Sequence, residues 1–522
     1  MENFDYDLQS LQEARNLARL GKIATDKLAD YTEEQIDKIL QNMVRVAEEN
    51  AVMLAKMAVE ETGFGKVEDK TYKNHMASTI VYNYIKDMKC SGIIHEDPVN
   101  KMMEVADPVG LIMGIVPSTN PTSTAIYKSM IAIKARNAIV FSPHPSALQC
   151  TLKAATLMRD AAVAAGAPEN VIGCLSMPSM GATDELMKCK ETSMIIATGG
   201  PGMVKAAYSA GKPALGVGAG NSPSYIERTA DVAQSVKEIL ASKTFDNGTV
   251  CASEQSVICE ECNRDQVIAE FKKQGGYFMT AEETAKVCNL LFKNGGHSMS
   301  AKFVGRSAQV IATAAGISIP DGTRVLIGEQ QGVGDGYPLS YEKLTTVLAF
   351  YTVRDWHEAC ELSMKLLQNG IGHTMNIHTN DPQIVREFSR KPASRILVNT
   401  GGTQGGTGAS TALAPAFTLG CGTWGGSATS ENVTPMNLVN VKKVVYGLKD
   451  VTTLAQSDPT FHPDFGCCRG SNAAGAQPSP MQYSGSCNCG SANQGIPAAD
   501  GIDGKQLLDL VNELVNAMKS GS

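Results

Sequence analysis

Three short apolar runs, each ended by proline or glycine, limit the fold of this chain more than any other feature. They are VGLIMGIVP, AIVFSPHP and TSMIIATGG, at residues 109–117, 138–145 and 192–200. A run that is apolar at successive positions is typical of a parallel strand buried on both faces. Helical patterns follow the three runs at residues 124–137, 147–168 and 202–211. This alternation predicts βαβ units and a doubly wound parallel sheet in an α/β protein.

The rest of the chain is organised around this pattern. Residues 1–90 carry apolar side chains at helical spacing, with Thr32 as an expected helix N-cap and Gly63 as a helix end. A second α/β pattern begins near Asp231 and ends near residues 423–427. Its expected strands are residues 255–261, 301–305, 325–331, 346–353, 375–381 and 395–402, and residues 437–447 form a last strand.

Composition and charge exclude several classes of protein. The 522 residues carry a net charge of −7, so the chain lacks the basic excess that neutralises the phosphates of a nucleic acid. We expect no signal peptide, because the N-terminus is acidic, and no membrane span, because no stretch reaches about 18 apolar residues. The 14 cysteines therefore fit free thiols in the cytoplasm better than disulfides.

The composition changes in the C-terminal part of the chain. Residues 454–500 are rich in proline, glycine and serine and carry few charges, which predicts a flexible linker. After the linker, Leu507, Val511, Leu514 and Met518 recur at helical spacing. This spacing predicts a short amphipathic helix. Such a helix is marginal alone in water, so we expect it to fold against a partner.

One cysteine stands out by its surroundings. Cys251 lies in TFDNGTVCASEQS, residues 244–256, on a loop that follows an Asn-Gly turn and precedes an expected strand. Most cysteines are inert and buried, but loops between regular elements are where functional groups gather. The segment has no CxxC or histidine partner and the chain has no HExxH, so a zinc site is not indicated.

Four segments in a constant order resemble the aldehyde dehydrogenase superfamily over about residues 10–447. They are residues 110–147, 198–223 and 338–351 together with the Cys251 segment. The resemblance implies an α/β fold with a Rossmann-type cofactor domain, an α/β catalytic domain and a small β oligomerisation arm. The implied boundaries are 1–92 and 105–230 for the cofactor domain, 93–104 and 430–450 for the arm, 231–429 for the catalytic domain, 451–500 for the linker and 501–522 for a targeting helix.

The resemblance also implies the chemistry. Cys251 matches the nucleophile that attacks an aldehyde and carries a thioester after hydride transfer to NAD. Asn120 matches the side chain that stabilises the oxyanion together with the Cys251 N–H, although Asn-Pro is also a common turn. Hydrolytic members carry a glutamate where this chain has Val217, in ALGVGAGNSP, so no base activates water at that position. The variant segments look like the CoA-acylating branch, and a thiol acceptor needs no such base.

Further site residues follow from the same segments. Gly199 and Gly200 precede a helix whose N-terminus favours phosphate oxygens. Glu342 matches a ribose-binding glutamate, the alternative being an exposed helix-start carboxylate, and His373 matches an acid/base group, although a lone histidine is more often structural. The segment SPHP replaces a lysine that many members carry, and it has no arginine for a 2′-phosphate, which favours NAD over NADP. The expected cofactor contacts are Pro117, Ser118, Thr119, Asn120, Pro121, Thr122, Ser142, His144, Gly199, Gly200, Gly218, Glu342 and Leu419.

The tail implies a location. The linker and last helix resemble encapsulation peptides, which dock enzymes on the shell proteins of bacterial microcompartments; a helix packed on its own oligomer is the alternative. We therefore expect the lumen of a microcompartment in the cytoplasm, with propanal from 1,2-propanediol or acetaldehyde from ethanolamine or choline as the aldehyde. No metal is expected, because the linker cysteines match no standard site. They are Cys467, Cys468, Cys487 and Cys489.

The sequence thus predicts a CoA-acylating aldehyde dehydrogenase that uses NAD and coenzyme A. We expect a homodimer or homotetramer, with residues 95–108 pairing with residues 437–447 of a neighbour. Two alternatives are a hydrolytic dehydrogenase, disfavoured by Val217, and a catalytically idle scaffold, disfavoured by the joint presence of Cys251, Asn120 and Glu342. A fusion with an alcohol dehydrogenase is similar in its first half, but the chain is short for it and has no histidine cluster after residue 450.

Overall fold

The computed structural model describes residues 5–293 and 297–461, and the chain divides into two units, Met1–Leu448 and Lys449–Ser522. Of the second unit, the described residues hold one short helix, α17 (Leu454–Ser457). The expected targeting helix, the four linker cysteines and most of the linker lie outside the described residues. The cysteines that the structure does describe are all free thiols, as predicted.

Helices form the N-terminal region, as predicted. Thr32 caps α2 through a reciprocal capping box with Gln35, and Gly63 ends α3 with a left-handed φ of 68°. The stretch between these two signals is divided at Asn50, which separates α2 from α3. The elements are α1 (Tyr6–Leu28), α2 (Glu33–Glu49), α3 (Ala51–Thr62), α4 (Val67–His75), a π-helical turn (Met76–Ile80) and α5 (Val81–Ile85).

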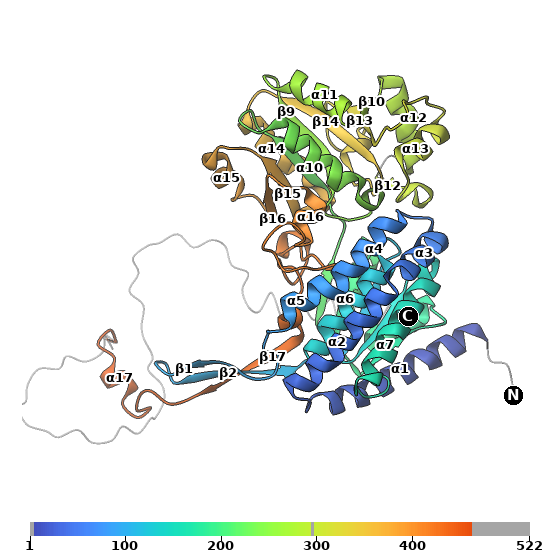
Figure 1. Cartoon of the computed structure of the whole chain (residues 1–522). Coiled ribbons are helices and arrows are strands. Elements are labelled where there is room, and N and C mark those ends of the chain that lie inside the picture. Colours follow the sequence, from blue (N-terminus) through green and yellow to red (C-terminus); the bar gives the residue numbers. More distant parts are fainter. Residues whose placement is uncertain (1–4, 294–296, 462–522) are drawn as a thin grey trace, which may run out of the picture. The chain divides into compact units, whose positions relative to one another are not determined.

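A five-stranded parallel sheet carries the first α/β pattern, in the order β5-β4-β3-β6-β7. Its helices α6 and α7 pack against α2 of the N-terminal region (Figure 1). The three apolar runs form β3, β4 and β6, which confirms the predicted βαβ units. The chain adds β4 and β5 on one side of β3 and then β6 and β7 on the other. The strand order therefore reverses between β3 and β6, and a crevice forms at such a point. The elements are β3 (Leu111–Val116), α6 (Pro121–Lys134), β4 (Ile139–Pro143), α7 (Leu148–Ala164), β5 (Ile172–Cys174), α8 (Met180–Lys188), β6 (Thr192–Thr198), α9 (Pro201–Tyr208) and β7 (Ala214–Val217).

A seven-stranded parallel sheet carries the second pattern, in the order β10-β13-β14-β9-β8-β15-β16. It has its own apolar core, which includes Ile258, Leu326 and Met375. Its first strand, β8, precedes the boundary expected at residue 231, and the domain boundaries remain predictions. The elements are β8 (Ser222–Ile226), α10 (Val232–Thr244), β9 (Glu254–Glu260), α11 (Arg264–Lys273), β10 (Gly276–Phe278), α12 (Ala281–Leu291), α13 (Ala308–Ala315), β13 (Val325–Glu329), β14 (Val347–Val353), α14 (Trp356–Leu367), β15 (Gly372–His378), α15 (Pro382–Phe388), β16 (Ala393–Val398) and α16 (Gly402–Gly406), with a small hairpin of β11 (Phe292–Lys293) and β12 (Ser298–Met299).

One expected strand of this region is wrong. Residues 301–305 form a short 3₁₀ turn over Ala301–Phe303. Gly305, with a φ of 65°, turns the chain there and donates its N–H to the carbonyl of Leu344. An isolated run of so few apolar residues does not separate a strand from a tight turn.

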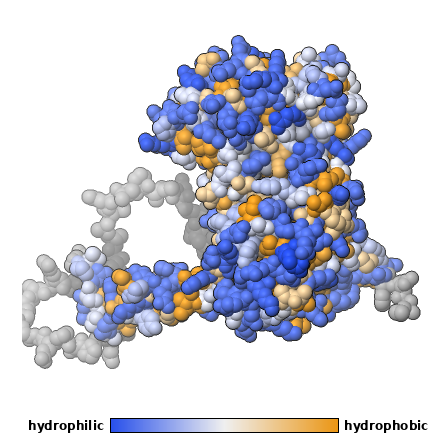
Figure 2. Space-filling model, viewed as in Figure 1, coloured by the Kyte–Doolittle hydropathy of each residue, from blue (hydrophilic) through white to orange (hydrophobic). Residues whose placement is uncertain are grey.

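The arm is a separate antiparallel sheet of β1 (Gly92–Asp97), β2 (Met102–Pro108) and β17 (Val439–Val445), in the order β1-β2-β17. β2 pairs with β17 of the same chain, with Val439 opposite Pro108 and Val445 opposite Met102. The expected pairing of these segments with a neighbouring chain is therefore replaced by pairing within one chain. β17 is an edge strand with exposed valines, and Figure 2 shows apolar side chains on the arm.

No helix in residues 5–293 or 297–461 combines the length and hydrophobicity that a bilayer span requires. Across the same residues, no group of histidine, cysteine, aspartate and glutamate side chains is arranged to hold a metal ion.

Candidate active site

A cavity of about 380 Å³ opens at the carboxyl ends of the five parallel strands. The loops after β3 and β6 form part of its wall, on the two sides of the point where the strand order reverses. In open α/β sheets, ligands bind in this crevice. The sequence-predicted residues that line the cavity are Pro117, Ser118, Thr119, Asn120, Ser142, His144, Gly199, Gly200, Gly218, Cys251, Glu342 and Leu419.

Three expected site residues lie apart from this lining. Pro121 and Thr122 are buried in the first turn of α6, where the Thr122 hydroxyl donates to Asn74 Oδ1 at 2.8 Å. These two residues hold the loop after β3 rather than face the cavity. His373 is buried in β15 and reaches the site through its contact with Cys251.

The turn before Cys251 has an unusual backbone. Asp246, Asn247 and Gly248 have φ values of 48°, 52° and 76°, so three successive residues are left-handed. For a residue other than glycine this conformation costs roughly 1–2 kcal/mol. Asn247 Nδ2 donates to the carbonyl of Gly305 at 2.9 Å and helps to hold the turn. The predicted Asn-Gly turn is confirmed, and it places Cys251 ahead of β9.

Cys251 and His373 are in contact. His373 Nε2 lies 3.1 Å from Cys251 Sγ, and His373 Nδ1 lies 2.7 Å from Thr374 Oγ1. Burial raises the pKa of the Cys251 thiol to about 12, and the nearby Glu342 and Cys421 also raise it. Burial lowers the pKa of His373 well below its ordinary value, and the charge of Arg395 lowers it further. Both shifts favour the uncharged pair, a thiol in hydrogen-bond contact with a neutral imidazole.

Arg395 is a site residue that the sequence reasoning missed. It is a buried side chain of β16, and Nη1 donates to Asn432 Oδ1 at 3.1 Å. Its Nε donates to Thr374 Oγ1 at 3.4 Å, which links it to His373 through one hydroxyl. Its positive charge lowers the pKa of Cys251 and so partly offsets burial. In the sequence, Arg395 is a single arginine within an apolar strand pattern, and nothing in that pattern indicates that it lies near Cys251.

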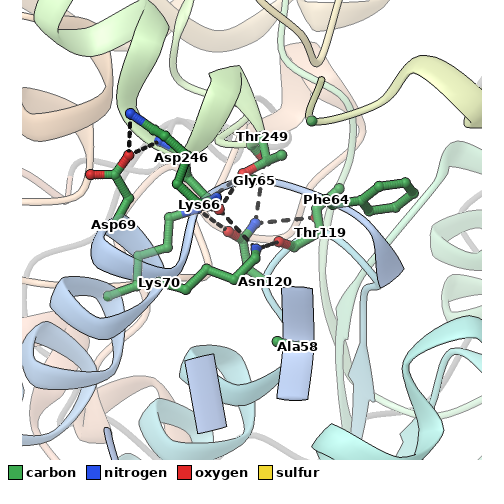
Figure 3. Close-up of polar contacts among 12 residues, drawn as sticks. Ala58, Phe64, Gly65, Lys66, Asp69, Lys70, Thr119, Asn120, Asp246 and Thr249 are labelled. Atoms are coloured by element: carbon green, nitrogen blue, oxygen red, sulfur yellow. Dashed lines mark hydrogen bonds and ion pairs between the residues drawn. The ribbon is translucent and has the colours of Figure 1, made fainter. Parts of the chain in front are cut away.

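The Asn120 side chain is held at both ends. Its Oδ1 accepts a hydrogen bond of 2.6 Å from Lys73 Nζ. Its Nδ2 donates to Thr119 Oγ1 at 3.1 Å and to the carbonyl of Thr249 at 3.3 Å (Figure 3). Thr119 and Thr249 both line the cavity, so the donor end of the amide lies on that side.

Two buried lysines of α4 lie behind Asn120, and the sequence reasoning missed both. Lys70 Nζ and Lys73 Nζ lie 2.8 and 2.5 Å from Asp246 Oδ2. Lys70 also donates to the carbonyl of Thr119 at 2.9 Å, and Figure 3 shows Lys66, Asp69 and Lys70 gathered around Asp246. Burial lowers the pKa of Lys73 to about 8 although Asp246 opposes the shift. Lys73 therefore stays largely protonated at neutral pH.

Glu342 lies on the loop before β14 and is partly buried, so the alternative of an exposed helix-start carboxylate is wrong. Its Oε1 accepts from the Gly220 N–H at 2.9 Å. Burial raises the pKa of Glu342 to about 7. Gly220 itself packs on the nucleophile: a Cβ added there would lie 1.9 Å from the Cys251 carbonyl oxygen. The backbone turn GVGAG thus connects Glu342 with Cys251.

Val217 ends β7 and lines the cavity with its buried, apolar side chain. The residue at this position offers no proton acceptor to the thiol. The adjacent Phe417 and Leu419 extend the apolar lining.

Another part of the lining is suited to phosphate groups. Gly200 is the N-cap of α9, and its Cβ position is open space. A helix N-terminus without side chains in front of it suits phosphate oxygens. Ser142 and Thr183 add hydroxyl groups, 2.9 Å apart, to the lining. No lysine or arginine is among the described residues that line the cavity.

Comparisons with known proteins agree with this geometry. A sequence model of the aldehyde dehydrogenase family matches residues 7–280. The bifunctional aldehyde-alcohol dehydrogenase AdhE of Escherichia coli K12 is 47% identical over 442 residues, which are 83% of this chain and 49% of that protein. The chain thus spans about half the length of the first curated relatives it matches. The succinate-semialdehyde dehydrogenase (acetylating) of Clostridium kluyveri is 40% identical over 84% of this chain and 96% of its own length.

Solved structures give the same result. An acetylating aldehyde dehydrogenase from Geobacillus thermoglucosidasius is 53% identical, with a TM-score of 0.84, over 86% of this chain and 99% of its own. A propionaldehyde dehydrogenase from the fucose utilisation bacterial microcompartment of Clostridium phytofermentans is 25% identical, with a TM-score of 0.76, over 83% of this chain and 97% of its own.

Proposed function

Because the chain belongs to the aldehyde dehydrogenase family, we propose that it is a CoA-acylating enzyme that oxidises a short aliphatic aldehyde with NAD and coenzyme A. The observation that carries the proposal is the pairing of Cys251 with His373 beside the apolar wall of Val217. A thiol and an imidazole in hydrogen-bond contact suit covalent catalysis. Relatives described as acetylating or acylating support the second substrate.

The residues of the chain handle the proton and the charge of the first half-reaction. Cys251 Sγ attacks the aldehyde carbon, and its proton passes to His373 Nε2. The aldehyde oxygen becomes an oxyanion, which Asn120 Nδ2 and the Cys251 N–H stabilise. Bound NAD supplies the hydride acceptor of this step. Loss of the hydride from the tetrahedral carbon leaves a thioester on Cys251.

The second half-reaction transfers the acyl group to a thiol. His373 first releases its proton to solvent. It then accepts the proton of the CoA thiol as the thiol attacks the thioester, and passes it to the departing Cys251 sulfur. A water molecule is a weaker nucleophile and needs a carboxylate base close to the carbonyl carbon. The valine at position 217 cannot provide one.

A hydrolytic function is the second candidate, and Glu342 is the observation that favours it. This carboxyl group lines the same cavity as Cys251, and its pKa of about 7 leaves it partly ionised at neutral pH. Its hydrogen bond from Gly220 directs Oε1 to the backbone. We therefore assign Glu342 to the cofactor ribose rather than to water activation.

The dependence on CoA tests these alternatives. With aldehyde and NAD but no CoA, we expect a burst of about one NADH per active site and then little turnover, because the thioester persists. Added CoA should restore steady turnover and yield acyl-CoA, as measured by NADH absorbance and mass spectrometry. Steady acid formation without CoA would contradict the proposal. If that acid formation is lost in Glu342→Gln, the hydrolytic alternative with Glu342 as base is correct.

The absence of a basic side chain from the described lining supports NAD rather than NADP as the oxidant. A 2′-phosphate is usually met by an arginine near the ribose. Exposed valines on the edge strand β17 support a homodimer or homotetramer assembled through the arm, because an unpaired apolar edge favours pairing with another copy.

We further propose the lumen of a bacterial microcompartment as the location, with acetaldehyde or propanal as the substrate. The linker and the amphipathic helix that the sequence predicts support this location, as does the similarity to a propionaldehyde dehydrogenase from a microcompartment. The expected partner is a shell protein that binds the helix through an apolar groove.

Truncation after Leu454 tests the location. The truncated enzyme should keep the kcat and KM of the full chain, because every proposed site residue precedes residue 454. It should no longer co-purify with shells that retain the full chain. Simultaneous loss of activity and of shell binding would instead favour packing of the tail on its own oligomer.

A further inference from the structure

The orientation of the Asn120 amide is set by a buried lysine. An amide side chain has one end that accepts hydrogen bonds and one that donates them, and the two ends have nearly the same shape. Lys73 Nζ donates to Oδ1 at 2.6 Å. A protonated lysine can only donate. Rotation of the amide by half a turn would therefore bring two donors together and lose the hydrogen bond.

We propose that Lys73 is a positioning residue for Asn120, holding the amide oxygen so that Nδ2 is directed toward the reacting carbonyl oxygen. The inference rests on the proposed function, in which Nδ2 stabilises the oxyanion. In the described structure Nδ2 donates to Thr119 Oγ1 at 3.1 Å and, over a longer distance of 3.3 Å, to the Thr249 carbonyl. An oxyanion would replace the weaker of them with a charge-assisted hydrogen bond.

The position of Lys73 is itself fixed by several contacts. Its ammonium group lies 2.5 Å from Asp246 Oδ2 and 3.0 Å from Thr249 Oγ1, and 5.4 Å from the centre of the Phe245 ring. The side chain is 2% exposed, so it cannot turn to solvent. Asp246 and Thr249 belong to the segment that carries Cys251. One ammonium group thus connects the nucleophile segment with the oxyanion donor.

The charges around Asn120 also favour this orientation of its amide. Lys70 and Lys73 share the single carboxylate of Asp246, and Lys66 pairs with Asp69 at 2.7 Å. One positive charge is therefore left over among these five side chains. The ammonium group of Lys73 lies 2.6 Å from Asn120 Oδ1 and polarises the amide, which makes Nδ2–H a better donor to a negative oxygen.

A double-mutant cycle of Lys73→Met and Asn120→Ala tests the proposal with NADH formation as the readout. Lys73→Met leaves Lys70 and Asp246 as a balanced pair, so we expect the variant to fold. We expect Asn120→Ala to lower kcat by about 10²–10³-fold, and Lys73→Met by about 10²-fold, the cost of a small misplacement. In the Asn120→Ala background, Lys73→Met should cost less than about threefold, because the partner is already gone.

Lys70→Met is the matched control. Lys70 lies on the same helix, is similarly buried and shares the same carboxylate, but its hydrogen bonds go to Asp246 and to the carbonyl of Thr119 rather than to the Asn120 side chain. We expect its loss in kcat to be at least about tenfold smaller than that of Lys73→Met. A second readout is the alkylation of Cys251 by iodoacetamide, which forms no oxyanion. Its rate should change by less than about threefold in Lys73→Met.

The outcomes separate the inference from the proposed function. Three outcomes would show that Lys73 only supports the fold: additive losses in the cycle, equal losses in Lys70→Met and Lys73→Met, or a parallel fall in the alkylation rate. None of these outcomes would contradict the proposed function, because the wild-type enzyme would still be active. A wild-type enzyme that is alkylated at Cys251 but forms no NADH from aldehyde, NAD and CoA would overturn the proposed function and the inference together.

Discussion

The Cys251→Ala variant is expected to lose at least about 10⁴-fold in kcat for NADH formation, because removal of a covalent nucleophile leaves only binding and oxyanion stabilisation. The fold should survive, since the side chain is small and its polar contact is the 3.1 Å hydrogen bond with His373. The measurement is NADH absorbance in the presence of aldehyde, NAD and CoA. Circular dichroism of the same sample checks that the protein is folded.

Mass spectrometry of the intact chain gives the second readout of this variant. In the absence of CoA, the wild type should gain the mass of one acyl group, and peptide mapping should place it on Cys251. Cys262→Ala is the matched control, because Cys262 is exposed and lies eleven residues after Cys251, in the turn that follows β9. This variant should keep both the acyl label and the activity. A labelled Cys251→Ala chain, or one that still turns over, would contradict the assignment.

Asp246→Ala is expected to reduce the free energy of unfolding by about 3–5 kcal/mol, the cost of breaking a buried ion pair from one side. The change leaves Lys70 and Lys73 buried without their carboxylate. It also frees the left-handed turn, because Asp246 Oδ1 accepts from the Lys66 N–H at 2.8 Å. Urea unfolding of both proteins at neutral pH measures the difference.

The pH dependence of this effect has a definite sign. Burial raises the pKa of Asp246, but Lys73 and Lys70 together lower it by more than burial raises it. The pKa of Asp246 is therefore below its ordinary value. A carboxyl group whose pKa is lowered by folding stabilises the protein above its unfolded pKa of about 3.9 and loses this contribution as the pH falls. The difference between wild type and Asp246→Ala should therefore shrink below about pH 4.

Asp184→Ala serves as the control for the stability experiment. Asp184 pairs with Lys188 on an exposed helix surface at 2.9 Å, and such pairs contribute about 0.3–0.5 kcal/mol. If Asp246→Ala costs no more than Asp184→Ala, the buried cluster does not stabilise the turn before Cys251.

Much of the fold could be predicted because the strands are buried on both faces. The runs that became β3, β4 and β6 are apolar at nearly every position, and proline or glycine marks where each ends. The loops that line the cavity were predicted from the family resemblance, and in the structure they follow the carboxyl ends of these strands. Strands β5 and β7 were not predicted, because they are three and four residues long and so too short to show a strand-like hydrophobic pattern.

The charged residues of the site could not be predicted for a different reason. Lys70 and Lys73 are separated from Asp246 by more than 170 residues, and a lysine in a polar helix usually reads as a surface residue. Their burial follows from how α4 packs against the turn before Cys251. Arg395 was hidden in the same way within a strand. Resemblance located the residues that we propose to touch the substrate, whereas contacts distant in sequence supply the charges behind them.

The buried valine at the end of β7 has a thermodynamic consequence for the proposed reaction. When the acyl group leaves Cys251 only by transfer to another thiol, the product is again a thioester, which conserves most of the free energy released by the oxidation. Hydrolysis to the acid would dissipate that free energy. Both half-reactions then lie close enough to balance to run backward. The same cavity would reduce an acyl-thioester to the aldehyde whenever NADH is abundant, and the supply of the two nucleotides would set the direction of flux.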